Sequence, residues 1–225
     1  MPLISVITPV SRGIDHLSHL VRDFHNQTFK NFEHNIIYDG KPSQNIFDFM
    51  KLHEKDYNVK FTWIKKDIGD MNTSPGTNPR NYGIAASTGK FCCFCDDDDR
   101  YSDHYLETFA SNISDNSIVV VQMSCQTSRI YKDGSPDRTI LVPEIGLPTF
   151  PIICHVGTPC FCLPTFYART EPWRHEPEHD FRFIKRICDK FHPEIRIIGG
   201  MMIDVDSKVI GTLRDWVSIP PFYRE

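Results

Sequence analysis

The sequence lacks any run of about 18 apolar residues, the length that a membrane-spanning helix needs, and lacks a charged N-terminal region followed by an apolar signal core. It also lacks an excess of basic residues, because 25 lysines and arginines face 29 aspartates and glutamates. The resulting formal charge of -4 provides no basic field for binding nucleic acid. We therefore expect a soluble, cytoplasmic protein with no integral membrane segment and no nucleic-acid partner.

The two glycine-rich phosphate-binding motifs are absent as well. Neither G-x-x-x-x-G-K-[ST] nor G-x-G-x-x-G occurs, which removes the main support for a P-loop nucleotidase or a dinucleotide dehydrogenase. No internal repeat, low-complexity tract or separating linker is found. With 225 residues, 40% of them hydrophobic, the chain can bury one sizeable core, and we expect a single domain over residues 1–225.

The eight cysteines lie mostly inside apolar, strand-like runs. This placement favours reduced structural thiols over a zinc site or a disulfide framework. They are Cys92, Cys93, Cys95, Cys125, Cys154, Cys160, Cys162 and Cys188.

Strand and helix patterns alternate along the first half of the chain. Apolar strands are expected over residues 3–8, 32–38 and 59–64, and the segments between them repeat apolar residues at helical spacing. This order predicts βαβ units and a mostly parallel central sheet flanked by helices, a Rossmann-like α/β arrangement. We expect Asp15 and Asp103 to cap two of the helices.

The second half of the chain shows a looser pattern. A strand over residues 160–168 contains Pro164, which suggests a sheet edge or a bulge. Turn residues at 132–136 predict a hairpin, and two short strands are expected over 195–198 and 201–205. A smaller C-terminal subsheet is therefore expected beside the parallel one.

Four consecutive aspartates, Asp96 to Asp99, follow the wholly apolar strand of residues 91–95. If the strand geometry continues, Asp96 and Asp98 point to one side and Asp97 and Asp99 to the other. A D-x-D pair offers hard oxygen ligands to Mg²⁺ or Mn²⁺ and leaves positions open for phosphate oxygens. The alternative is a solvated acidic turn.

Other polar residues are expected at the same edge of the sheet. Thr8, Pro9 and Asp39 also lie where strands end, and the carboxyl ends of parallel strands form one rim, where ligands of open α/β sheets bind. Without a glycine-rich cradle, a metal is the natural means of holding a diphosphate. Arg80, near the start of a helix, could assist or could form an ordinary surface salt bridge.

Five motifs in order resemble the family 2 glycosyltransferases, which have the GT-A fold. The V-S-V-I-x-P strand is matched by Ile4–Pro9, the Q-T-(F/Y)-x-(D/N)-(F/Y)-E segment by Gln27–Glu33, and V-D-D-G by Ile37–Gly40. The segment A-R-N-x-G-I-x-x-A-x-G-x-(Y/F) is matched by Pro79–Phe91, and F-L-D-x-D-D by Phe94–Asp99. The resemblance runs from Ile4 to about Ile198. It implies an inverting, metal-dependent transferase with residues 1–100 as the nucleotide-binding half and 101–225 as the acceptor-binding half.

The resemblance also implies roles for individual donor-side residues. Thr8, Pro9 and Asp39 would line the base pocket, with Asp39 accepting from a uracil N–H, which favours a UDP-sugar donor. Arg80 would lie beside the base or the diphosphate. Asp98 would bind Mn²⁺ or Mg²⁺, and Asp96 or Asp97 would hold the ribose.

On the acceptor side, the family's Glu-Asp pair falls on His179-Asp180, so the chain departs from the pattern at the first position. The resemblance makes Asp180 the general base, alone or with Glu178 taking part of the work. Trp173 and His175 precede it and could contact an acceptor sugar, although core filling is equally expected for the tryptophan. His155 could be an extra metal ligand or incidental.

The leading hypothesis is thus a metal-dependent inverting glycosyltransferase that moves a sugar from a nucleotide-sugar to a hydroxyl of a glycan or glycoprotein acceptor. A nucleotidyltransferase, which also brings Mg²⁺ carboxylates to an α/β sheet edge, is one alternative. A non-catalytic domain that binds sugar nucleotides or glycans is another. The compact domain also resembles those with which large viruses glycosylate capsid protein.

Overall fold

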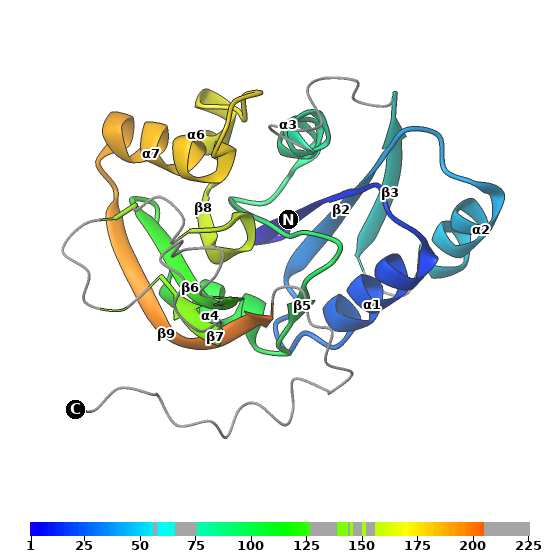
Figure 1. The fold of residues 1–225 in the computed structure, drawn as a ribbon, viewed down its shortest axis with the longest axis horizontal. Coiled ribbons are helices and arrows are strands. Elements are labelled where there is room, and N and C mark those ends of the chain that lie inside the picture. Colours follow the sequence, from blue (N-terminus) through cyan, green and yellow to red (C-terminus); the bar gives the residue numbers. More distant parts are fainter. Residues whose placement is uncertain are drawn as a thin grey trace.

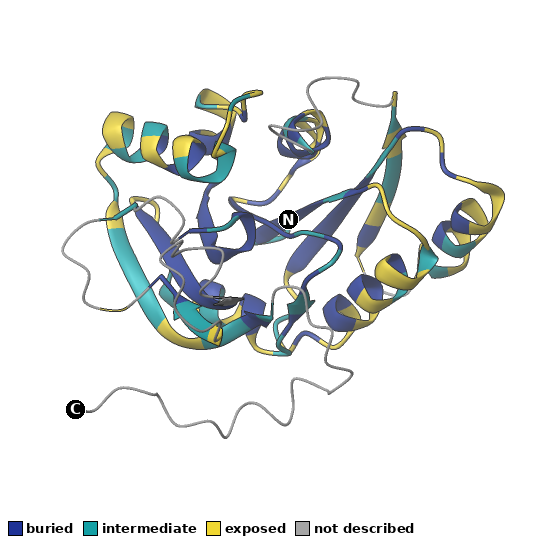
Figure 2. Cartoon of the chain, in the orientation of Figure 1, coloured by how far each residue is buried: buried dark blue, intermediate teal, exposed yellow. Residues whose placement is uncertain are grey.

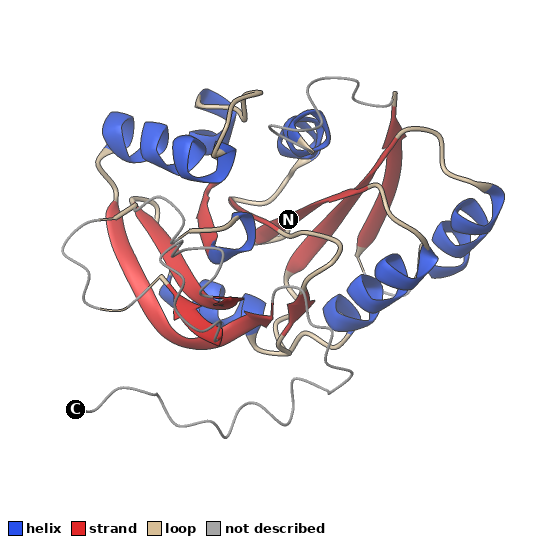
Figure 3. Ribbon diagram, viewed as in Figure 1, coloured by secondary structure: helices blue, strands red, loops and turns tan. Residues whose placement is uncertain are grey.

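A curled sheet runs through the molecule, with helices packed on both of its faces (Figure 1, Figure 3). The computed structural model describes residues 1–55, 58–65, 76–126, 139–143, 145, 150–151 and 156–204, and for 125 and 126 the backbone alone. Within these residues the sheet has nine strands in the order β3-β2-β1-β4-β8-β6-β9-β5, with β7 paired to β6. The α/β class predicted from the sequence is confirmed.

Two subsheets share this order. The first four strands, β3-β2-β1-β4, are all parallel, whereas β4 pairs antiparallel with β8 and opens the mixed second part. The strands are β1 (Ile4–Val10), β2 (Phe32–Asp39), β3 (Val59–Ile64), β4 (Phe91–Phe94), β5 (Arg100–Tyr101), β6 (Ser117–Gln126), β7 (Thr139–Val142), β8 (Phe161–Pro164) and β9 (Glu194–Asp204).

The helices form a layer on each face of the sheet. Helices α3, α6 and α7 lie together on one face, and α1, α2 and α4 lie on the other (Figure 1). They are α1 (Ile14–His25), α2 (Gln44–His53), α3 (Thr77–Ala86), α4 (Tyr105–Asn112), α6 (Thr165–Thr170) and α7 (His179–Phe191), with a short 3₁₀ helix η1 (Thr158–Cys160). Among the described residues, none of these helices is long and apolar enough to cross a membrane.

Burial of β4 explains its unbroken apolar sequence. All four of its residues are buried, because β1 and β8 pair with its two edges and helices cover its two faces (Figure 2). Its cysteines, Cys92 and Cys93, are free thiols. The outward sides of the helices are largely exposed (Figure 2), and the buried apolar residues lie on their inner sides, although α2 also exposes Phe47 and Leu52.

The prediction of one strand over residues 160–168 is wrong after Pro164, where a helix begins. Strand β8 ends at Pro164, which sits at the N-cap of α6, and it lies between β4 and β6 rather than at an edge. Proline is tolerated there because it is the last residue of the strand and supplies the backbone conformation that precedes a helix.

The two predicted C-terminal strands are one strand, β9. Its Gly199-Gly200 pair lies where the register with β6 shifts, and Gly200 has a φ of 112°. A glycine adopts this conformation without strain, so the bulge bends the strand instead of ending it.

The sequence also misplaced three smaller features. Strand β1 continues past Pro9, which is tolerated because β4 pairs with β1 only as far as Ile7. The N-cap of α1 is Gly13, two residues before the expected Asp15, and the N-cap of α4 is His104, one residue after the expected Asp103.

Outside the described residues lie the turn at 132–136, most of the segments 66–78 and 143–159, His155 and the chain beyond residue 204.

Candidate active site

The carboxyl ends of β2, β1 and β4 meet at one edge of the sheet. The three strands are adjacent and parallel, with Thr8 opposite Ile36 and Ile7 opposite Phe94. Asp39 closes β2, and the aspartates follow β4, so both lie at this edge. The rim that the strand order predicted is confirmed.

The four aspartates do not alternate between two sides. Strand β4 ends at Phe94 and residues 97–98 form a turn, so the pleat does not extend into the acidic segment. Asp98 forms an ion pair with Arg12, and Asp97 accepts weak hydrogen bonds from the backbone N–H groups of Ser11 and Arg12 at 3.3 and 3.4 Å. Asp97 and Asp98 therefore both contact the loop after β1.

Three of these carboxyl groups are easier to protonate than free aspartate. Burial raises the pKa of Asp96, Asp97 and Asp99, and neighbouring carboxylates raise each pKa further. Arg80 opposes the effect at Asp96, and Arg12 opposes it at Asp97. The segment therefore holds negative charge that the protein only partly neutralises.

Arg80 connects this segment to the face covered by α3. Its Nη2 donates to Oδ1 of Asp96 at 2.7 Å and to Oγ1 of Thr158 at 3.5 Å. Its guanidinium carbon lies 4.9 Å from the centre of the Trp173 ring. Arg80 is only 4% exposed, so it is an interior group and not a surface salt bridge.

Asp180 lies on the other side of Thr158, at the start of α7. Its Oδ1 accepts a hydrogen bond from the Thr158 hydroxyl at 2.7 Å and lies 3.0 Å from Nε2 of His179. Burial raises the pKa of Asp180, but His179, Arg80 and Thr158 lower it more, and the net shift is downward. Asp180 therefore stays ionised, as a proton acceptor must.

Glu178, the second candidate base, is placed differently. It is the residue before α7 in a left-handed conformation, with a φ of 54°, and its carboxylate lies 3.8 Å from Arg182. Its side chain is about half exposed. None of its described contacts joins it to Asp180.

The predicted donor residues divide between the two faces of the sheet. Pro9 lies on the face covered by α3. Gly76, the N-cap of α3, is so close to it that a Cβ added to Gly76 would lie 3.2 Å from the Pro9 ring and 3.0 Å from Arg80. Asp39 is two residues after Ile37 in β2 and therefore lies on the same face of the sheet, and Ile37 contacts α3. The Thr8 hydroxyl instead lies 2.9 Å from Nε2 of the buried His34, on the opposite face of the sheet, and the role of Thr8 in a base pocket stays a prediction.

Trp173 is part of the core and is not an acceptor platform. It is 2% exposed, Phe183 stacks on it at 4.2 Å with an interplanar angle of 6°, and Arg80 lies over the ring. The sugar-stacking prediction is corrected because these neighbours cover the ring. His175 is exposed, and its Nε2 lies 3.4 Å from Oδ1 of Asn78.

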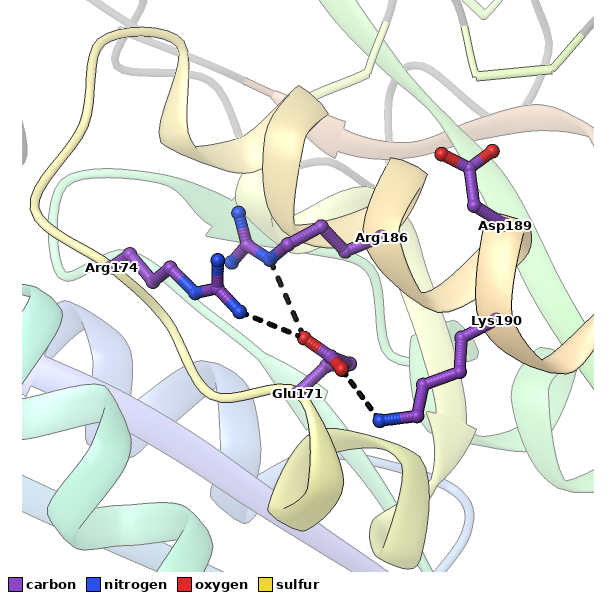
Figure 4. A pocket seen from close by; sticks show the side chains of 5 residues that line it. All are labelled: Glu171, Arg174, Arg186, Asp189 and Lys190. Atoms are coloured by element: carbon purple, nitrogen blue, oxygen red, sulfur yellow. Dashed lines mark hydrogen bonds and ion pairs between the residues drawn. The ribbon is translucent and has the colours of Figure 1, made fainter.

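A group of ion pairs holds α7, which carries Asp180, against the segment that follows α6 (Figure 4). Glu171 pairs with Arg174 at 3.1 Å, Lys190 at 2.7 Å and Arg186 at 3.7 Å. Arg186 also pairs with Glu176 and donates to the carbonyl of Pro172. Arg186 thus anchors the segment that contains Trp173.

The rim offers a divalent cation one partly exposed carboxylate, that of Asp98. The described residues contain no group of three or more histidines, cysteines or acids arranged to hold a metal. Mg²⁺ and Mn²⁺ are often bound by one or two carboxylates plus substrate phosphates, and Asp98 provides a partly exposed carboxylate with hard oxygens. A cation at Asp98 would compete with the Arg12 guanidinium.

Sequence reasoning missed Arg12 and Thr158. The position of Arg12, directly after the first strand in a region where strand ends gather, is a signal that could have been used. Thr158 gave none, because only the tertiary structure brings residues 80, 158 and 180 together.

The parallel strands, the acidic segment after β4 and the mixed second subsheet define an α/β fold of the GT-A type. A search of solved structures agrees. The chain matches TarS from S. aureus in complex with UDP at a TM-score of 0.68 and 17% identity, covering 91% of this chain and 60% of that one. It matches a mannosyltransferase from Pyrobaculum calidifontis in complex with GDP-Man and Mn²⁺ at a TM-score of 0.67 and 9% identity, covering 93% and 58%.

Sequence comparison assigns the family. The profile described as "Glycosyl transferase family 2" matches residues 5–163, and the chain belongs to this family. An uncharacterized glycosyltransferase of Rickettsia bellii is 30% identical over 159 residues, which are 69% of this chain and 22% of that protein. One of Haemophilus influenzae is 28% identical over 120 residues, 53% and 46% of the two chains. The chain thus spans less than half the length of each of these relatives.

Proposed function

We propose that this domain is an inverting glycosyltransferase that transfers a sugar from a nucleotide-sugar, with UDP as the leaving group, to a hydroxyl of a glycan or glycoprotein. The observation that carries the proposal is the linkage of Asp96 to Asp180 through Arg80 and Thr158. It joins Asp96, which would be a donor-side residue, to Asp180, which would be the base, and the two come from different halves of the chain. Family membership and the GT-A fold support the same reaction class.

On the donor side, Pro9 and Asp39 would contact the base, and Arg80 would hold Asp96 toward the ribose. Asp97 is fixed by the loop after β1 and would close the ribose side. Asp98 would bind Mn²⁺ or Mg²⁺, which when present neutralises charge on the departing diphosphate.

On the acceptor side, Asp180 would take the proton of the attacking hydroxyl. As the acceptor oxygen bonds to C1 of the sugar, the bond from C1 to the diphosphate oxygen breaks, and its electron pair leaves with the diphosphate. Attack from the opposite face inverts the anomeric centre, through a transition state like that of glycoside cleavage. Glu178, directly before α7, would take part of the work of the base, and the exposed His175 would contact the acceptor.

A screen of UDP- and GDP-sugars tests the proposal. Donor hydrolysis should appear with Mn²⁺, release a nucleoside diphosphate, and give the inverted anomer by proton NMR. Consumption of a nucleoside triphosphate with pyrophosphate release would indicate a nucleotidyltransferase instead. Binding of UDP and Mn²⁺ without any donor turnover would indicate a non-catalytic binding domain.

A further inference from the structure

We propose that His179 is a positioning residue for Asp180, and that together with Thr158 it fixes Oδ1 so that Oδ2 is the atom that takes the acceptor's proton. The inference rests on the proposed function of Asp180 as the base. It concerns the one position of the acidic pair where this chain has histidine in place of glutamate.

The geometry leaves one carboxylate oxygen available. Oδ1 of Asp180 accepts a hydrogen bond from the Thr158 hydroxyl at 2.7 Å and lies 3.0 Å from Nε2 of His179, so both of these contacts are made by the same carboxylate oxygen. Among the described residues, no hydrogen bond reaches Oδ2. The Asp180 side chain is 29% exposed, so a hydroxyl can approach the remaining oxygen.

His179 is itself held in place. Its side chain is 16% exposed, and its ring meets the edge of Trp173 with centroids 5.6 Å apart. Trp173 is in turn covered by Phe183 and Arg80. The imidazole therefore has a defined orientation toward Asp180, which a flexible surface histidine would not have.

The charge effect of His179 is opposite to that of glutamate. Four groups from separate elements face Asp180: Arg80 from α3, Asp96 after β4, Thr158 from η1 and His179 from α7. Burial raises the pKa of Asp180, whereas the hydrogen bond and charge of His179 are the largest of the effects that lower it. A glutamate beside Asp180 would add a like charge and raise that pKa.

The test compares His179→Gln, which keeps an N–H donor without a charge, with His179→Glu, which restores the family residue. In His179→Glu the acid limb of the kcat/KM profile should move up by about one pH unit, with a roughly tenfold loss at low pH that recovers at high pH. His179→Gln should show a smaller shift. His104→Gln, at an exposed histidine on the other face of the sheet, is the control. It should change neither the acid limb of the profile nor the activity at low pH.

A second readout needs no turnover. Carbon NMR of the aspartate carboxyl groups, assigned with Asp180→Asn, should show the pKa of Asp180 rise in both variants of His179. Uniform loss of kcat with an unmoved acid limb and an unmoved carboxyl titration would overturn the inference and leave His179 a packing residue. A shifted carboxyl titration in a protein that turns over no nucleotide-sugar would overturn the proposed function instead. An active Asp180→Asn variant would show that Asp180 is not the base, and would overturn this inference as well.

Discussion

Arg80 donates a hydrogen bond to Asp96 at 2.7 Å from inside the protein, beneath the rim where the parallel strands end. The same guanidinium lies over Trp173 and reaches Thr158, so it joins α3 to the segment after β4, to η1 and to the segment before α7. One buried cation thus orders residues from both halves of the chain.

Replacing Arg80 with alanine should destabilise the domain by about 3 kcal/mol, because Asp96 would lose its partner and Trp173 a packing neighbour. Urea unfolding monitored by tryptophan fluorescence measures the change. Arg182→Ala, at a half-exposed arginine on α7, should cost less than about 1 kcal/mol. Equal costs for the two variants would contradict the structural role given to Arg80.

Asp98→Ala should reduce Mn²⁺-dependent donor hydrolysis roughly 100-fold or more, because the carboxylate proposed to hold the cation is removed. Its circular dichroism should match the wild type, since Asp98 is partly exposed and its ion pair among the described residues is with Arg12. Asp115→Ala removes an exposed carboxylate paired with Lys90 and serves as the control. Full activity of Asp98→Ala would exclude the metal role.

Glu33→Gln should lower the stability at pH 7 by about 3 kcal/mol. Burial alone would raise the pKa of Glu33, but hydrogen bonds from Lys60, Ser5 and Thr88 lower it to about 2. A lowered pKa contributes stability that is complete above pH 4.5, the ordinary value, and is lost as the pH falls toward 2.

The difference in unfolding free energy between the wild type and Glu33→Gln should therefore shrink between pH 5 and pH 2, as followed by urea titrations. Glu54→Gln, at an exposed glutamate, should show no such trend. A difference that is independent of pH would mean that Glu33 contributes through packing rather than through its charge.

Gly83→Ala should destabilise the domain by about 1 to 3 kcal/mol, because the new Cβ would overlap Ile7 and lie 2.9 Å from Cδ1 of Ile37. The helix α3 would have to move away from the sheet, and with it Arg80. Gly13→Ala, where nothing lies within 4 Å, should cost about 1 kcal/mol or less. Thermal unfolding of the two variants provides the comparison, and a stable Gly83→Ala would show that α3 packs less tightly than the contacts indicate.

The sequence predicted the features that depend on local periodicity or on rules of chain topology. The parallel order around β1 followed from strand and helix alternation, and the position of Asp39 and the aspartates at one rim followed from that order. Gly83 and Arg80 were found as residues of a sequence motif. The structure shows that Gly83 packs closely on Ile7 and that Arg80 binds Asp96.

What could not be predicted depends on contacts between distant residues. The position of β8 between β4 and β6 is a non-local pairing with no local pattern, and the two residues of β5 are too few to show one. Thr158 and Arg12 reach the carboxylates only through tertiary structure. Trp173 was ambiguous because an aromatic residue near a site fits both a ligand platform and the core.

The insertion of β8 beside β4 has a consequence for dividing the chain. A truncation after residue 100 would strip β4 of its antiparallel neighbour and expose the backbone amides and carbonyls of the most apolar strand. Such an N-terminal fragment should self-associate through that edge, even though it carries Asp39, Arg80 and all four aspartates. The nucleotide binding proposed for this domain would therefore depend on a strand contributed some seventy positions later in the chain.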